Sequence, residues 1–155
     1  MSATEELAPE LMQAAQYFFD QIPFNRLVGI QVDSLSLDEV RMHVDMREEL
    51  VGNHMQGILH GGVIASILDV AGGAMALLGA FQRFPGLPAV ERMMSLSKLG
   101  TIDMRVDYLR PGRGQRFDAK ATLLRAGNKV AVVRSELYND DGYLIAVGTG
   151  TYLVG

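Results

Sequence analysis

The stretch "LHGGVIASILDVAGGAMALLGAF", residues 59–81, decides the fold. From Gly61 to Phe81 its only polar side chains are those of Ser66 and Asp69. About 20 apolar residues could span a membrane, but this segment carries a carboxylate near its middle, five glycines and no Lys/Arg or Trp/Tyr belt at its ends. We therefore predict the central helix of a globular core and no membrane span. The lone carboxylate of Asp69 then needs an explanation.

Composition narrows the class of protein. The chain has 155 residues, 48% of them apolar and 21% charged, which predicts one globular domain over residues 1–155. A net charge of −4 without a basic stripe argues against a nucleic-acid partner. There is no cysteine, which excludes disulfides and thiolate sites and fits a cytoplasmic location. The first residues lack the basic and then apolar pattern of a signal peptide.

Segments on both sides of the apolar helix alternate like half-buried strands. The candidate strands cover residues 29–37 (with a slip of phase at Ser34 that suggests a bulge), 40–46, 103–110, 117–123, 129–138 and 143–154. Short Gly-containing turns such as "RPGRG" (110–114) predict that the last four strands form a meander of hairpins. An amphipathic pattern predicts an N-terminal helix over 1–23, followed by a core over 24–154; its apolar residues are Leu7, Leu11, Ala14, Ala15, Phe18 and Ile22. The fold class is therefore α+β, one sheet packed on one long helix.

Candidate chemistry lies where the loop enters this helix. A helix start exposes N–H groups without internal partners, and Gly61 and Gly62 would let a ligand oxygen approach them, as in an oxyanion hole. Asp69, two turns further on, is a candidate general base. Close packing of the glycines and a carboxylate satisfied by its neighbours are the alternatives. His54 and His60 lack a third ligand for a metal, and no complete cofactor motif occurs, so we expect no metal and no cofactor.

An ordered set of motifs carries a resemblance to a known family. His60-Gly61-Gly62 with Asp69, then "GTIDMRVDYLRPGRG" and "LLRAGNKVA", resembles the hotdog-fold acyl-CoA thioesterases of the PaaI-like group. The likeness to the enterobacterial YigI-type enzymes extends along the whole chain. The resemblance implies an antiparallel sheet wrapped around the helix, a homodimer with active sites at the subunit interface, and a possible dimer of dimers. It also implies hydrolysis of medium- to long-chain acyl-CoA.

The resemblance assigns roles to particular residues. Asp69 would activate water or attack the thioester directly, Gly61 would donate its N–H to the thioester oxygen, and Thr101 would orient the water. Many relatives carry an Asn six residues before the histidine, where this chain has His54. The remaining substrate-binding candidates are therefore Asn53, His54, Gln56, His60 and Gly62. Candidates for the CoA phosphates lie at two turns: Arg110, Arg113, Arg125, Asn128 and Lys129, with solvated turn residues as the alternative. Candidates for an acyl channel, or simply for core, are Met42, Met46, Met55, Met93, Met94 and Leu96.

Two other functions remain open from the sequence. A hotdog dehydratase of hydroxyacyl thioesters would pair a histidine with a helix carboxylate, and His54 with Asp69 could fill those roles. The His-Gly-Gly helix entry argues against this reading, because that group usually enters the helix through Pro-Gly. A non-enzymatic acyl-CoA-binding hotdog protein would keep the cationic turns but would not need Asp69.

Overall fold

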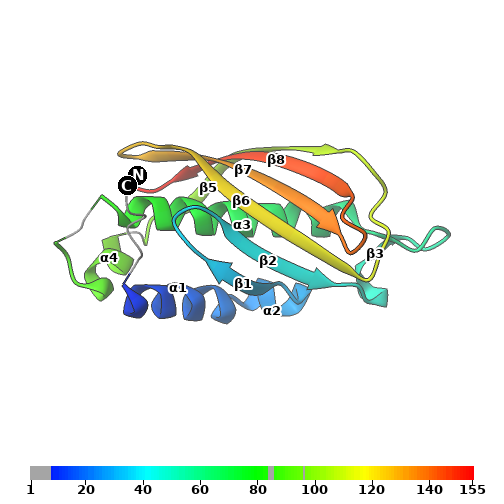
Figure 1. Ribbon diagram of the computed structural model, residues 1–155, viewed down its shortest axis with the longest axis horizontal. Coiled ribbons are helices and arrows are strands. Elements are labelled where there is room, and N and C mark those ends of the chain that lie inside the picture. The colour runs from blue at the N-terminus through cyan, green and yellow to red at the C-terminus, as the bar shows by residue number, and fades with distance from the viewer. Residues whose placement is uncertain (1–7, 84–85, 96) are drawn as a thin grey trace.

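A six-stranded antiparallel sheet wraps around one long helix in the computed structural model, which describes residues 8–83, 86–95 and 97–155 (Figure 1). The helix is α3, Gly61–Phe81. The strands, in their order across the sheet, are β1 (Gln31–Leu35), β2 (Val40–Asp45), β6 (Arg116–Ala126), β7 (Val130–Asn139), β8 (Leu144–Leu153) and β5 (Gly100–Tyr108). The inward-facing residues of β2, β5, β6, β7 and β8 pack on α3, and β1 packs against the N-terminal helix, so the predicted α+β architecture is confirmed.

Helix α3 forms the centre of the core. Every residue from Ala71 to Phe81 is buried. By length and a mean hydropathy of 1.9 the helix could cross a membrane, yet 78% of its most apolar stretch is buried inside the fold. Its first two turns are only partly covered, because Val63, Ser66 and Asp69 remain half-buried. The fold therefore covers the second half of α3 completely and leaves one side of the first half accessible.

The N-terminal region forms two helices where the sequence predicted one over 1–23. Helix α1 spans Pro9–Gln21 and α2 spans Pro23–Val28, while residues 1–7, including Leu7, lie outside the described residues. The break occurs because a residue before proline avoids helical angles, and Ile22 is extended with ψ 119°. On α1 the buried positions are Leu11, Ala15 and Phe19, whereas Phe18, predicted to face inward, is 43% exposed.

The predicted meander is wrong at strand β5. Residues 130–153 do form a hairpin, and β6 pairs with β7, but β5 pairs with β8 at the edge of the sheet instead of with β6. The "RPGRG" segment is thus a crossover rather than a hairpin turn. Residues 109–115 connect β5 to β6 and can span about 23 Å when extended. This exceeds the roughly 14 Å that separate β5 from β6 across the sheet, which is three strand spacings. The sequence specifies the strands well but does not specify which strand lies next to β5.

Smaller elements complete the entry to α3. A 3₁₀ turn at Glu48–Leu50 leads into a short hairpin of β3 (Val51–Asn53) and β4 (Ile58–Leu59). Helix α4, Ala89–Ser95, follows α3. The register of β1 against β2 slips between Val32 and Ser34, which confirms the bulge.

His43 on β2 is a buried polar residue. It alternates with the apolar residues of this strand and would face solvent by that pattern, but the structure buries it. Its ring Nδ1 lies 2.8 Å from Asp33 Oδ1 on the neighbouring strand, so the ring is covered by a polar partner.

Candidate active site

Asp69 is paired with Thr101, and this pairing accounts for the lone carboxylate of the apolar helix. The Thr101 hydroxyl donates a hydrogen bond of 2.8 Å to Asp69 Oδ1. Asp69 lies half-buried in the middle of α3, and Thr101 lies exposed near the start of edge strand β5. The structure thus brings together two of the three residues expected to carry catalysis, with the carboxylate open on one side.

Tyr152 supports Asp69 from the interior, and the sequence analysis missed it. Tyr152 lies directly opposite Thr101 in the β5–β8 pairing, and its hydroxyl donates a 3.2 Å hydrogen bond to the main-chain oxygen of Asp69. Burial, and then the nearby negative charge of Asp69, raise the pKa of the Tyr152 phenol above its usual range. The phenol is therefore a permanent donor at neutral pH.

Glycines make room for the Tyr152 ring. A Cβ placed on Gly72 would lie 2.2 Å from the Tyr152 hydroxyl oxygen, and one on Gly150 would lie 2.7 Å from it. Glycine within a helix costs about 1 kcal/mol relative to alanine, so a mid-helix glycine indicates close packing by something large. The Gly72-Gly73 pair was thus the available sequence signal for a bulky residue against α3 next to Asp69.

The start of α3 leaves one backbone donor available. His60 is the N-cap, and its ring Nδ1 accepts a 2.7 Å hydrogen bond from Gly62 N–H. Val63 and Ile64 donate to the His60 carbonyl. Within the described part of the chain, no atom accepts a hydrogen bond from Gly61 N–H. His60 and Gly62, both predicted to contact substrate, therefore satisfy each other, and Gly61 alone offers a free N–H.

Tyr108, at the far end of β5, holds Gly61 in place. Its hydroxyl donates a 3.0 Å hydrogen bond to the Gly61 carbonyl, and a Cβ on Gly61 would lie 3.3 Å from its ring. The two residues share a cavity of about 460 Å³ with Gln56 and Arg110. Gly61 and Asp69 are eight residues apart on one helix, which corresponds to about 12 Å. Within one chain, a single small group therefore cannot contact both.

The loop before α3 holds the remaining substrate-binding candidates. The Asn53 side chain closes a tight turn by accepting a 3.2 Å hydrogen bond from Met55 N–H, and His54 is exposed in the same turn. The Gln56 carbonyl and side-chain oxygens accept hydrogen bonds from Arg113 at 3.3 and 3.1 Å. No hydrogen bond in the described residues links this loop to Asp69, so within one chain the loop belongs to the Gly61 end.

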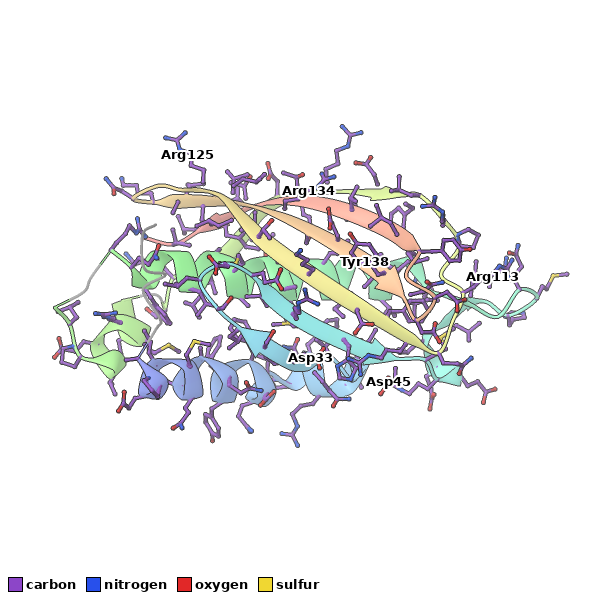
Figure 2. The ribbon with its side chains drawn as sticks, viewed as in Figure 1. Asp33, Asp45, Arg113, Arg125, Arg134 and Tyr138 are labelled. Atoms are coloured by element: carbon purple, nitrogen blue, oxygen red, sulfur yellow. The ribbon has the colours of Figure 1, made fainter. Side chains whose placement is uncertain are left out.

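The five predicted CoA-binding residues do not form one cluster in the chain. Figure 2 shows Arg113 and Arg125 toward opposite ends of the sheet. Strand β6, which follows Arg113 and carries Arg125 near its end, is about 33 Å long. Arg110 and Arg113 lie in the β5–β6 crossover, where Arg110 donates to the Leu144 carbonyl at 2.8 Å. Arg125 lies near the end of β6, and Asn128 and Lys129 lie in the turn before β7. One chain therefore presents two separate cationic ends.

The methionines predicted as a channel also lie apart. Met42 is fully buried in the core, Met55 is 92% exposed at the loop tip, and Leu96 lies outside the described residues. Met46 packs against the core. Met93 and Met94 line an apolar cavity of about 670 Å³ between α1, α3 and α4. Another cavity, of about 770 Å³ on strands β2, β6 and β7, is lined mainly by charged residues and also includes Met42, which therefore lies apart from Met93 and Met94.

Comparison with known proteins identifies the family of the chain. A family model described as the thioesterase superfamily matches residues 56–146. The medium/long-chain acyl-CoA thioesterase YigI of Salmonella typhimurium is 46% identical over 155 residues, 100% of each chain, and its Escherichia coli counterpart is 45% identical over the same span.

Solved structures agree in fold. A Shewanella oneidensis protein related to the thioesterase superfamily is 48% identical with a TM-score of 0.90, covering 94% of this chain and 96% of that chain. The Escherichia coli PaaI protein has a TM-score of 0.74 over 94% of each chain at 18% identity, a likeness of fold alone.

Proposed function

Because the chain belongs to the thioesterase superfamily, we propose that it hydrolyses medium- to long-chain fatty acyl-CoA to the free fatty acid and CoA. Membership of this family confirms the hotdog fold and the thioester-hydrolase class that the motifs predicted. The observation that carries the proposal is the Asp69–Thr101 pair together with the free N–H of Gly61. The absence of cysteine fits a reducing compartment, and we propose the cytoplasm as the location.

The residues match the needs of thioester hydrolysis. Water held by Thr101 attacks the carbonyl carbon while Asp69 accepts its proton, and the oxygen that gains negative charge is stabilised by Gly61 N–H. Direct attack by the Asp69 carboxylate, followed by hydrolysis of the anhydride, uses the same groups. The tetrahedral intermediate collapses by expelling the CoA thiolate. A thiol with a pKa near ~8.5, by analogy with cysteine, leaves without a strong general acid.

We propose that each active site is built from two chains. Asp69 and Gly61 are too far apart in one chain to share a carbonyl group, and β5 is an edge strand with free backbone groups. Antiparallel pairing of β5 with a second copy, about a two-fold axis near Met104, would place Thr101 opposite Tyr108 of the partner, and hence Asp69 near the partner's Gly61. A further association of two such dimers is compatible with this arrangement.

The same pairing unites the cationic ends. The turn that carries Asn128 and Lys129 lies at the Thr101 end of the sheet, because Val130 and Gly100 both pair with Leu153. The crossover that carries Arg110 and Arg113 follows Tyr108, at the other end of β5. A two-fold axis between these ends brings the crossover of one chain to the turn of the other, which would form one phosphate-binding site from both groups.

Thiol release from a chain-length series of acyl-CoAs tests the reaction. We expect wild type to release thiol and Asp69→Asn to lose at least about a hundredfold in kcat, the usual scale for a catalytic base. Asp20→Asn, an exposed carboxylate on α1, is the matched control and should retain activity. A wild type that binds acyl-CoA without releasing thiol would instead be a binding protein. Water loss from hydroxyacyl-CoA would indicate the dehydratase.

Mixed dimers test the shared site. Gly61→Pro removes the N–H that is proposed to bind the thioester oxygen. The helix should tolerate the substitution, because proline suits the first position of a helix and His60 already has the extended angles (φ −62°, ψ 134°) that a residue before proline prefers. We expect this variant to lose about 10²- to 10³-fold in kcat, whereas Gly61→Ala keeps the donor. Co-refolding equal amounts of Gly61→Pro and Asp69→Asn should restore about a quarter of wild-type activity, because half of the dimers then hold one intact site. Sites formed within one chain would show no recovery.

A further inference from the structure

We propose that the groove between α1, α3 and α4 binds the acyl tail of the substrate and sets the chain length that the enzyme prefers. This inference rests on the proposed function and adds the position of the acyl tail in the active site. The groove has a volume of about 670 Å³, inside the usual range for small-molecule sites. Its lining includes Ala14, Phe18, Leu77, Val90, Met93 and Leu99.

The groove approaches the reaction centre at Leu99. This residue lies immediately before β5 and two residues before Thr101, and it packs against the core. Thr101 itself faces α3, because its hydroxyl reaches Asp69. Leu77 follows Asp69 by eight residues, about 12 Å further along α3. A linear chain whose carbonyl lies beside Asp69 and Thr101 can therefore run along α3 toward α4.

The chemistry of the groove suits a hydrocarbon. Its polar lining residues are Glu10 and Ser97, and apolar side chains provide the rest of the wall. Phe18 is 43% exposed, and Val90 and Met94 are each 70% exposed, so the described chain leaves this apolar surface uncovered. A tail without polar atoms can fill such a space without leaving a hydrogen-bonding group unpaired. The charged half of the substrate would stay at the cationic loops on the rim of the sheet.

Chain-length dependence follows from this placement. Each methylene that enters the groove should improve binding about fourfold until the groove is full. Trp in place of Ala14 would fill the groove from α1, and Trp in place of Val90 would fill it from α4. Gln13→Trp is the matched control, because Gln13 is exposed on the neighbouring face of α1.

The experiment measures kcat/KM for hexanoyl-, decanoyl- and myristoyl-CoA in the four proteins. We expect Ala14→Trp and Val90→Trp to lower kcat/KM for myristoyl-CoA at least about tenfold and for hexanoyl-CoA less than about twofold, with Gln13→Trp equal to wild type. Calorimetric titration with myristic acid should show the same loss of binding in the two groove variants, independently of turnover. A melting curve identifies a variant that has failed to fold.

Three results overturn the inference. Equal losses for all chain lengths in both folded groove variants would place the tail elsewhere, and unchanged activity on myristoyl-CoA would do the same. A change in oligomeric mass caused by either groove variant would make this surface an interface between copies of the chain. A wild type that hydrolyses no acyl-CoA refutes the proposed function, and the titration with myristic acid then decides on the groove alone.

Discussion

Removing the Tyr152 hydroxyl should have opposite consequences at neutral and at alkaline pH. In Tyr152→Phe the ring keeps its place between Gly72 and Gly150, and only the hydrogen bond to the Asp69 carbonyl is lost. One such bond contributes about 1 kcal/mol, so at pH 7 we expect the free energy of unfolding to fall by about 1 kcal/mol and Tm by roughly 2–4 °C. The hydroxyl holds the main chain rather than the carboxylate, so the loss in kcat should be far smaller than in Asp69→Asn.

The alkaline effect follows from the raised pKa of the buried phenol. The pKa of the Tyr152 phenol is higher in the folded protein than in the unfolded chain, where it is near ~10. The phenol therefore contributes its full stabilisation of the folded state below about pH 10, and this contribution is lost as the pH rises above that value. By pH 11 wild type should have lost about 1.4 kcal/mol from this source, whereas the phenylalanine variant has no phenol to ionise. The difference in stability between the two proteins should therefore vanish or reverse.

Urea unfolding at pH 7, 9, 10 and 11 is the assay. Tyr143→Phe, which removes an exposed hydroxyl, is the control and should change the free energy of unfolding at pH 7 by less than about 0.5 kcal/mol. A difference between wild type and Tyr152→Phe that stays constant from pH 7 to pH 11 would refute the reasoning, and so would a variant as stable as wild type at pH 7.

Three further perturbations test other parts of the structure. His60→Ala removes the N-cap and should cost about 1 kcal/mol in thermal unfolding, with His60→Asp restoring most of it; equal losses in both would contradict a capping role. Ile102→Lys places a charge on edge strand β5, which is proposed to pair with a second copy of the chain. Light scattering should then show the smaller mass of a single chain, and the activity assay should show that thiol release is lost. Neighbouring Arg41 and Lys120 lower the pKa of Glu39, so its contribution to stability should be present above about pH 4.3 and lost in acid; Glu39→Gln should flatten acid unfolding curves between pH 5 and 3.

The sequence predicted best those elements that local physics specifies. Helix α3 was expected from 61 to 81 and spans Gly61–Phe81, because a continuous apolar run of that length with glycines at its start has few other stable forms. The bulge at Ser34 was readable because alternation with a period of two makes a single slip visible. In the site, the family resemblance implied catalytic roles for both Asp69 and Thr101, and the structure joins the two side chains by a hydrogen bond.

Relations between distant segments could not be predicted in the same way. The residues of 100–108 do not by themselves indicate that β8 rather than β6 lies beside them, since both are long strands with an apolar inner face. The partnership of Tyr152 with Asp69 depends on that same neighbourhood. The separation of Arg113 from Arg125 also follows from the sheet, because the sequence gives their spacing along the chain but not the straightness of the strand between them.

The position of β5 also affects the order in which the chain can fold. Among the described strands of one chain β5 pairs with β8 alone, and 35 residues (109–143) separate the end of β5 from the start of β8. During synthesis β5 must therefore leave the ribosome and wait unpaired until β8 follows, while β6 and β7 can close a hairpin at once. Long-range pairing of this kind slows folding and exposes an apolar edge to other nascent chains. The strand proposed to join two mature subunits is thus also the strand most exposed to premature association.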